Sequence, residues 1–224
     1  MEKTLIYCMV WEYELINIYA GLAYYLVKSL RGIGEIKGDI IIFTDSNRDW
    51  SPHSQYSQIK KVEGLNCHVF WRKAYLGATQ DFSNYDRIIY LDVDLIILAP
   101  LSSYLIAQQD LIQFESTHFT LKPNKPRQDF YGWSLIEKSL DPKLHSIFAK
   151  KYGLNTSLVY AERDIFIKFC KQWWENQNLD LTNDQSVANW LVYGVRYFKG
   201  FPNLMPWLNL KGAQKQEPKY WEIK

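Results

Sequence analysis

The stretch that decides the fold is YDRIIYLDVDLIILAPL, residues 85–101, in which two aspartates interrupt an apolar run. The residues around the aspartates are β-branched or bulky, as in a strand buried on both faces of a parallel or mixed sheet. An ionised carboxylate inside such a sheet is costly unless it is paired or bound to a metal. We therefore expect the strand to end near Leu91. Asp92 and Asp94 then face a cleft, where carboxylates at spacing i, i+2 can share one face and hold one hard cation.

The composition sets the broad class of the protein. A chain of 224 residues is long enough for one full core and too short for two comfortable domains, so we expect a single α/β domain. The net charge is only +2 and the basic residues are scattered, which argues against a nucleic-acid partner. The aromatic content of 16%, with nine Trp, suits stacking on a sugar or a base but is more often a property of the core.

Cysteine usage and the N-terminus bear on the compartment. The three cysteines, Cys8, Cys67 and Cys170, are widely spaced in apolar surroundings, which fits buried thiols in a reducing compartment better than disulfides or a zinc site. The apolar run at residues 5–11 ends at Glu12, and no small-residue cleavage site follows. We therefore expect no signal peptide, no transmembrane span and a cytoplasmic location.

The hydrophobic pattern begins with a β-α-β order, typical of nucleotide-binding sheets, which bind ligands beyond the carboxyl ends of their strands. Apolar runs predict strands, and helical spacing predicts helices. The predicted strands are 4–10, 39–44, 110–115 and 154–160, and the predicted helices are 15–30, 164–176 and 184–193, the last capped by Asn183 and ended by Gly194. Residues 48–68 read as a loop with one short strand ending near 69–71, and 118–132 as a long loop over the site.

Four features follow one another along the chain: the paired aspartates, a turn at Asn155, Asp184-Gln185 at a helix start, and Gly212-Ala213-Gln214-Lys215 near the end. In this order they resemble the glycogenin-like family of retaining glycosyltransferases, which includes bacterial lipopolysaccharide galactosyl- and glucosyltransferases. The resemblance is best over YDRIIYLDVDLIIL, which looks like that family's strand and DxD motif. It covers most of the chain in weaker form, including residues 155–159, where the family has an Asn-small-Gly-Val turn.

The resemblance implies the α/β fold called GT-A, a Rossmann-like, mixed or parallel central sheet flanked by helices. It also implies a single domain, with a nucleotide-binding half at 1–100 and an acceptor half with the C-terminal tail at 101–224. The implied activity is transfer of a hexose, with retention, from a UDP-sugar such as UDP-glucose or UDP-galactose. The acceptor would be a hydroxyl of a glycan, a lipid-linked glycan or a protein.

The resemblance also implies a Mn²⁺ or Mg²⁺ ion that neutralises charge on the leaving diphosphate. Asp94 would bind the ion with both oxygens, and Asp92 would bridge the ion and the ribose. Lys215, on a Gly-rich flexible tail that also carries Gly212, would close over the phosphates. The family's usual third metal ligand is a His, and Asn209 stands at its position, so the ion meets a weaker, neutral carbonyl oxygen.

The remaining implied residues bind the donor. Lys73, or its neighbour Arg72, matches the basic residue that reaches the donor ahead of the DxD strand. Asn155 and Gln185 would hydrogen-bond sugar hydroxyls or face the anomeric carbon, and Asp184 would bind a hydroxyl of the transferred sugar. A tyrosine near the first strand end would stack on the base. Both Tyr13 and Tyr19 are candidates for this role.

Alternative functions remain open at this point. Ser157 stands where the family has Gly, and together with Asn209 it leaves room for a protein that binds a nucleotide sugar without catalysis. A strand ending in DxD is also the motif of haloacid-dehalogenase-type phosphohydrolases, where the first Asp is the nucleophile. That motif normally opens the chain, whereas here it is central. Taken alone, Asp184-Gln185 also suits a helix N-terminus, and Asn155 suits any turn.

Overall fold

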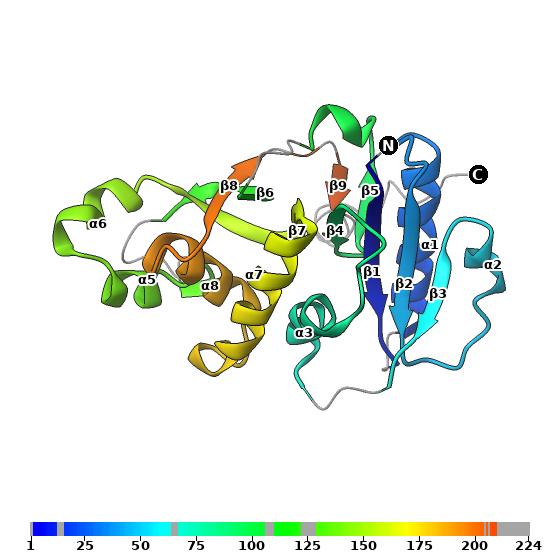
Figure 1. The fold of residues 1–224 in the computed structure, drawn as a ribbon, viewed down its shortest axis with the longest axis horizontal. Coiled ribbons are helices and arrows are strands. Elements are labelled where there is room, and N and C mark those ends of the chain that lie inside the picture. The colour runs from blue at the N-terminus through cyan, green and yellow to red at the C-terminus, as the bar shows by residue number, and fades with distance from the viewer. Residues whose placement is uncertain are drawn as a thin grey trace, which may run out of the picture. The chain divides into compact units, whose positions relative to one another are not determined.

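The computed structural model describes residues 2–12, 16–63, 67–105, 110–121, 129–203, 205 and 207–209, with only the backbone for 117–119 and 207–209. The protein is mixed α/β, with a mostly parallel, seven-stranded sheet in the order β3-β2-β1-β4-β7-β6-β8, flanked by helices (Figure 1). A second sheet pairs β5 with β9. The mixed α/β class with a central sheet flanked by helices is confirmed, and the sheet is compatible with a Rossmann-like fold. The narrower GT-A assignment stays a prediction.

The elements have the following bounds. The strands are β1 Thr4–Val10, β2 Asp39–Thr44, β3 Gln58–Lys61, β4 Arg87–Leu91, β5 Leu95–Ile97, β6 Leu111–Thr120, β7 Tyr152–Glu162, β8 Lys199–Asn203 and β9 Trp207–Asn209. The α-helices are α1 Ile16–Arg31, α2 Ser51–Ser54, α3 Arg72–Thr79, α5 Trp133–Ser139, α6 Pro142–Phe148, α7 Arg163–Glu175 and α8 Asp184–Asn189. The 3₁₀ helices are η1 Val69–Trp71, η2 Leu101–Ser103 and η3 Gln177–Leu179, and η4 Trp190–Gly194 is a π-helix.

The chain forms two compact units. Unit 1 comprises Met1–Leu5, Gly64–Tyr90 and Leu105–Met205. Unit 2 comprises Ile6–Glu63, Leu91–Tyr104 and Pro206–Lys224. The expectation of one domain with halves at 1–100 and 101–224 stays a prediction.

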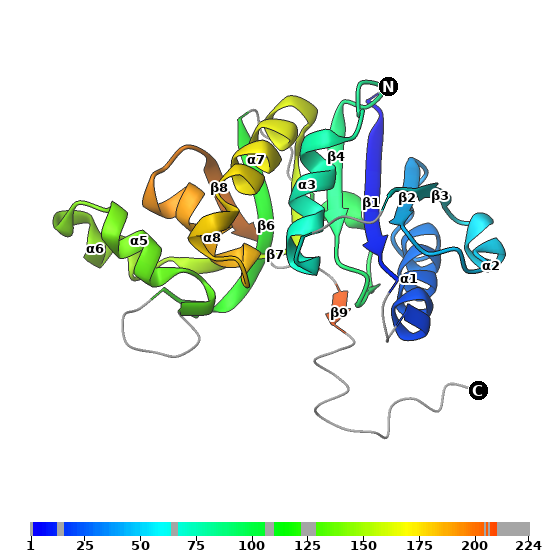
Figure 2. The ribbon, with the colours of Figure 1, turned by 90° about the horizontal axis from the view of Figure 1, so that it is seen from below.

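Unit 2 is built around apolar strands and one amphipathic helix. Strand β2 is buried from Ile40 to Thr44 and pairs in parallel with β3, and α1 lies beside β2 (Figures 1 and 2). One side of α1 is buried, and its last turn carries Lys28 and Arg31, which favour the helix dipole. The hydroxyl of Ser29 accepts a hydrogen bond of 3.1 Å from the backbone N–H of Ile97, which fixes β5 against α1.

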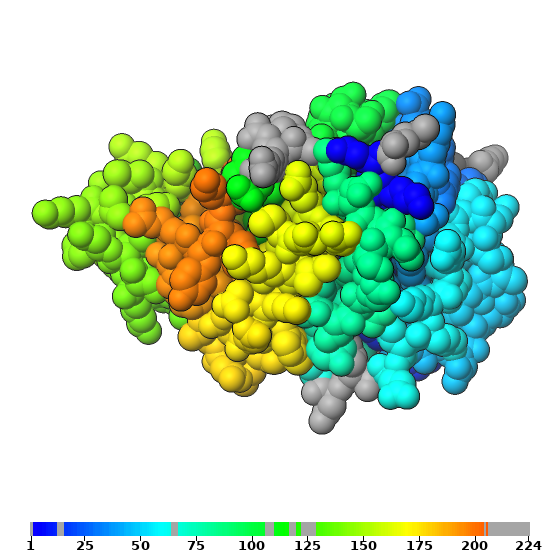
Figure 3. Space-filling view, in the orientation of Figure 1, coloured from blue at the N-terminus to red at the C-terminus, as the bar shows by residue number. Residues whose placement is uncertain are grey.

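Unit 1 is built around strands β6, β7 and β8 and the helix pair α3–α7. Strand β6 pairs antiparallel with β7 and parallel with β8. Helices α3 and α7 lie side by side (Figure 2), and both reach the surface (Figure 3). Their contact is close because Gly77 lacks a side chain where Cys170 and Phe166 of α7 come near. Large aromatic side chains, among them Phe114, Phe169 and Trp173, fill the space between this helix pair and the strands.

Four local predictions differ from the structure. Residues 69–71 form a 3₁₀ helix instead of a strand end, because the His68 ring accepts a hydrogen bond from the N–H of Phe70 and caps the turn. Residues 48–68, expected to be mostly loop, include α2, which has a proline in its first turn, as well as β3. Strand β6 runs on to Thr120, into the expected loop at 118–132, because β7 supplies a partner there. The helix from Asp184 changes to a π-helix at Trp190 before it ends at Gly194.

The other predicted elements are confirmed to within a few residues, with the strand before the aspartates ending at Leu91. Helix α8 begins as expected, because the Asn183 side chain accepts a hydrogen bond of 3.2 Å from the N–H of Gln185. Among the helices that the structure describes, none has both the length and the apolar character that crossing a membrane requires.

The α3–α7 contact gives a test of the fold. A methyl group at Gly77 would lie 2.3 Å from Sγ and 2.9 Å from Cβ of Cys170, so Gly77→Ala forces the helices apart. We expect the free energy of unfolding, measured by urea denaturation, to fall by about 1–3 kcal/mol. Gly21→Ala is the matched control: no heavy atom lies within 4 Å of its added methyl group, so the substitution in α1 is expected to be neutral or stabilising. Equal effects of both substitutions would contradict the close packing.

Candidate functional site

A network of buried polar side chains lies in unit 1. The ammonium of Lys73 lies 2.9 Å from Oδ2 of Asp184, and both side chains are buried, with 5% and 7% of their surface exposed. Nζ of Lys73 also donates to Oγ1 of Thr156 at 2.9 Å, and the Thr156 hydroxyl donates to Oδ2 of Asp184 at 2.9 Å. The three side chains come from α3, β7 and α8 and form a closed triangle of charged and polar contacts.

Aromatic rings surround the ammonium group. Nζ of Lys73 lies 5.3 Å from the ring centroid of Tyr90 and 5.6 Å from that of Trp173. The indole N–H of Trp173 donates to the backbone carbonyl of Asp184 at 2.7 Å. Burying a charge in such surroundings is costly, and the ion pair, the hydroxyl and the π faces together offset that cost. Each charge of the pair therefore depends strongly on the presence of the other.

Gln185 joins the network through its carboxamide. Oε1 of Gln185 accepts a hydrogen bond of 3.2 Å from the backbone N–H of Thr156, which fixes which end of the amide is oxygen. Nε2 of Gln185 is buried and, within the described part of the chain, has no hydrogen-bond acceptor. A buried donor without an acceptor costs about 1–3 kcal/mol, and such groups are rare unless a ligand or water uses them. The polar group of Gln185 that has no partner among the described residues is therefore a donor and not an acceptor.

An irregularity in β7 brings these groups together. Phe114 and Glu115 of β6 are neighbours, but their partners on β7 are Val159 and Asn155. Residues 156–158 therefore bulge out of register with β6, a feature that is common beside functional sites. The bulge places the side chain of Thr156 against Lys73 and Asp184.

Asn155 and Ser157 lie on the same bulged segment. Oδ1 of Asn155 accepts from the N–H of Ser157 at 3.0 Å, so the side chain closes a local turn, as the sequence suggests. The Ser157 hydroxyl makes a short hydrogen bond to the carboxylate of Glu115, the residue opposite Asn155 on β6. Thr156 and Glu115 are absent from the candidates drawn from the sequence. The sequence gives one signal for the Glu115 carboxylate: the polar residues Gln113 and Glu115 alternate with apolar ones.

Asp92 and Asp94 lie in unit 2, in the turn between β4 and β5. Asp94 is 7% exposed and Asp92 is half-buried. Burial, together with the nearby Asp92 carboxylate, raises the pKa of the Cys8 thiol to about 12, so this thiol stays protonated at neutral pH. Within the described ranges, no three His, Cys, Asp or Glu side chains gather into a complete metal site.

Asn209 comes close to this turn through strand pairing. Strand β9 pairs antiparallel with β5, and the backbone of Asn209 lies opposite Leu95, the residue that follows Asp94. Both strands belong to unit 2. The pairing brings together the three residues expected to hold the metal, although Asn209 is far from the other two in the sequence. The side chain of Asn209 lies outside the described part of the structure.

The remaining candidates are distributed as follows. Tyr19 is half-buried on α1 in unit 2, and Arg72 is half-buried beside Lys73 on α3 in unit 1. Tyr13, Gly212 and Lys215 lie outside the described residues. The structure thus brings Lys73, Asp184 and Gln185 together around the 155–157 segment.

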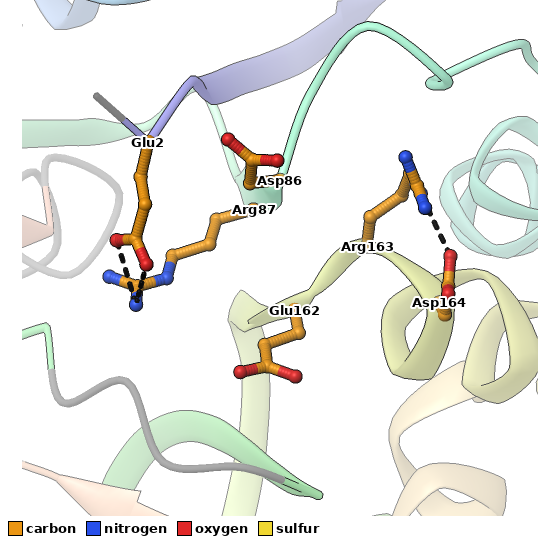
Figure 4. Close-up of a pocket in the computed structure, with 6 residues that line it drawn as sticks. All are labelled: Glu2, Asp86, Arg87, Glu162, Arg163 and Asp164. Carbon is orange, nitrogen blue, oxygen red and sulfur yellow. Dashed lines mark hydrogen bonds and ion pairs between the residues drawn. The ribbon is translucent and has the colours of Figure 1, made fainter.

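A pocket of ≈ 420 Å³ in unit 1 is lined by Glu2, Asp86, Arg87, Glu162, Arg163 and Asp164 (Figure 4). Both arginines in it are engaged. Arg87 pairs with Glu2 at 2.8 Å, and Arg163 pairs with Asp164 at 2.8 Å. None of the six residues belongs to the buried network or to the candidates from the sequence. The buried network is the better candidate because its polar groups are costly to bury and one of them, Nε2 of Gln185, has no acceptor among the residues that the structure describes.

The sequence matches no model of a known protein family, and a search of curated proteins finds no match either.

The ion pair can be tested through stability. Lys73→Met removes the ammonium and leaves the Asp184 carboxylate buried, so we expect the free energy of unfolding to fall by about 3–5 kcal/mol in chemical denaturation. Lys73→Met combined with Asp184→Leu removes both charges and should cost less than the sum of the two single substitutions.

The matched control is the exposed pair Arg163–Asp164. Asp164→Ala should leave the midpoint of denaturation unchanged within error, because exposed ion pairs add little to stability. A loss with Lys73→Met no larger than with Asp164→Ala would show that the buried pair is not coupled as described.

Proposed function

We propose that the chain is a metal-dependent, retaining glycosyltransferase that moves a hexose from a UDP-sugar to an acceptor hydroxyl. The observation that carries the proposal is the pairing of Asn209 with Leu95. It brings the third expected metal position next to the DxD turn, across a long separation in the sequence. Chain order alone does not require this pairing, and its backbone geometry suits the proposed metal-diphosphate site.

The donor set fits the proposed ion. Asp92 and Asp94 supply two carboxylates, and an asparagine amide would add a neutral oxygen, all of which are hard ligands suited to Mn²⁺ or Mg²⁺. Mg²⁺ in particular is commonly held by one or two carboxylates, with water and substrate phosphates completing its shell. When bound, the ion would supply positive charge to the leaving diphosphate. Asp94 is the stronger candidate for the main ligand because it is the more buried of the two.

The buried network of unit 1 suits recognition of the transferred sugar. Its ion pair is neutral overall, so it favours a neutral polyhydroxyl ligand over a charged one. Nε2 of Gln185 offers a hydrogen bond to a sugar oxygen. The carboxylate of Asp184 is held in place by Lys73 and Thr156, and an oriented carboxylate can accept a hydrogen bond from a hydroxyl. In this proposal Lys73 acts by holding Asp184, which differs from the direct contact with the donor that the resemblance implies.

Binding gives the first test. We expect UDP with Mn²⁺ to raise the melting temperature of the protein and Asp94→Ala to abolish that shift, because one of two carboxylate ligands is lost. Asp39→Ala, at the exposed start of β2 in the same unit, is the control and should keep the shift. The absence of a shift with any nucleoside diphosphate and metal would refute the transferase proposal. Release of phosphate from phosphomonoesters by the metal-loaded protein would instead favour a phosphohydrolase.

Turnover gives the second test. We expect slow hydrolysis of UDP-glucose or UDP-galactose in the absence of an acceptor, with the α-anomer of the free sugar as the first product. Proton NMR of the anomeric signals, recorded before mutarotation, distinguishes the anomers. The β-anomer as first product would rule out retention. A melting shift without turnover across a broad acceptor screen would favour a nucleotide-sugar binding protein.

A further inference from the structure

Thr156 is the residue that links the two α8 side chains of the network. Its hydroxyl donates to Oδ2 of Asp184 at 2.9 Å, and its backbone N–H donates to Oε1 of Gln185 at 3.2 Å. Its hydroxyl and its carbonyl also accept from Nζ of Lys73, at 2.9 and 3.4 Å. The residue is 2% exposed, so water does not compete for these bonds. One threonine therefore sets the positions of three functional groups.

The chemistry of the partners fixes the direction of each bond. An ammonium group has only donors and a carboxylate has only acceptors. The Thr156 hydroxyl must therefore accept from Lys73 and give its one proton to Asp184. The backbone N–H of Thr156 likewise can only donate, so it holds the oxygen end of the Gln185 amide. The Gln185 amide cannot reverse its orientation without losing this buried hydrogen bond.

The bulge of β7 makes this arrangement possible. In a regular pairing, a residue at this position would be in register with β6, but the register passes from Val159 directly to Asn155. Thr156 instead turns its hydroxyl toward Lys73 of α3 and Asp184 of α8, and its N–H toward Gln185 of α8. A valine would fill the same volume and suit a buried strand equally well. The hydroxyl is thus needed for the network and not for the packing.

We propose that Thr156 is a positioning residue, which orients the Asp184 carboxylate through its hydroxyl and the Gln185 amide through its backbone. The ligand atom that meets Gln185 is then a hydrogen-bond acceptor, namely a hydroxyl or ring oxygen of a neutral sugar. This inference rests on the proposed transferase function. It adds a residue that contacts no substrate itself and acts through two that do.

The test compares Thr156→Val and Thr156→Ser in the full-length protein. The valine variant keeps the shape and loses the hydroxyl, so we expect kcat for UDP-sugar hydrolysis to fall about 10- to 100-fold, because small misplacements of a reacting group are costly. In this proposal the ion and the diphosphate provide most of the affinity, so KM for the UDP-sugar should change less than about threefold. For the same reason, the melting shift with UDP and Mn²⁺ should change by about 1 °C at most. Thr156→Ser restores the hydroxyl and should recover most of the lost kcat.

A control separates positioning from stability. Ser186→Ala removes the hydroxyl whose one proton is donated to the Asp180 carboxylate or the Asn183 carbonyl at the start of α8. Neither of these acceptors is part of the Lys73–Asp184 pair. The kcat of Ser186→Ala should match the wild type even where its melting temperature falls as far as that of Thr156→Val. All assays run below the lowest melting transition. If Thr156→Val does not fold, the smaller Thr156→Ala replaces it.

The outcomes are distinct. If the wild type turns over and Thr156→Val has the same kcat, the positioning role is overturned. A loss of kcat that Thr156→Ser does not recover overturns it too. Both results leave the transferase proposal standing. A wild-type protein that neither binds UDP with metal nor hydrolyses a UDP-sugar overturns both. A fall in kcat confined to the valine or alanine variant supports the role.

Discussion

The buried ion pair between Lys73 and Asp184 is the constraint on which unit 1 depends. It joins a helix that precedes β4 to a helix near the end of the unit, and Thr156 of β7 completes the contact. Two charges with almost no exposed surface must be matched closely, since either one alone would be strongly unfavourable. The pair is accompanied by the bulge of β7 and by the Trp173 ring near the ammonium. Such an arrangement stabilises one geometry, and substitution of either Lys73 or Asp184 alone is expected to be strongly destabilising.

A different constraint applies where the chain enters unit 2, because two aspartates directly follow the apolar strand β4, which belongs to unit 1 up to Tyr90. β4 is buried over Ile88–Leu91, and the chain turns at once, before it re-enters the core at β5. The hydroxyl of Ser29 holds β5 against α1, and β9 adds a second edge with Asn209 opposite Leu95. Carboxylates and a potential amide ligand are thus carried by backbone that is fixed on both sides, which is the support a metal site requires.

Several features were readable from the sequence because their physical causes are local. The end of β4 followed from the cost of burying Asp92, and the start of α8 followed from the capping preference of Asn183. The confirmed strands and helices follow apolar runs and helical periods. Predictions from local patterns were wrong where another segment or side chain determines the structure. Strand β6 extends into the expected loop because β7 pairs with it. Residues 69–71 form a 3₁₀ helix that the His68 side chain caps. The grouping of Asn155 with Asp184 and Gln185 was expected from the resemblance, and their segments do meet through Thr156.

The sequence by itself determined the α/β class, the turn that carries Asp92 and Asp94, and the capped start of α8, because strand burial, carboxylate desolvation and helix capping act over a few residues. Only the tertiary structure decided the partners. It paired Lys73 with Asp184, made Thr156 their link, left Nε2 of Gln185 as a buried donor and set Asn209 opposite Leu95. These contacts join segments far apart in the chain. No local pattern encodes them, because a buried charge specifies that it needs a partner but not which residue the fold will bring to it.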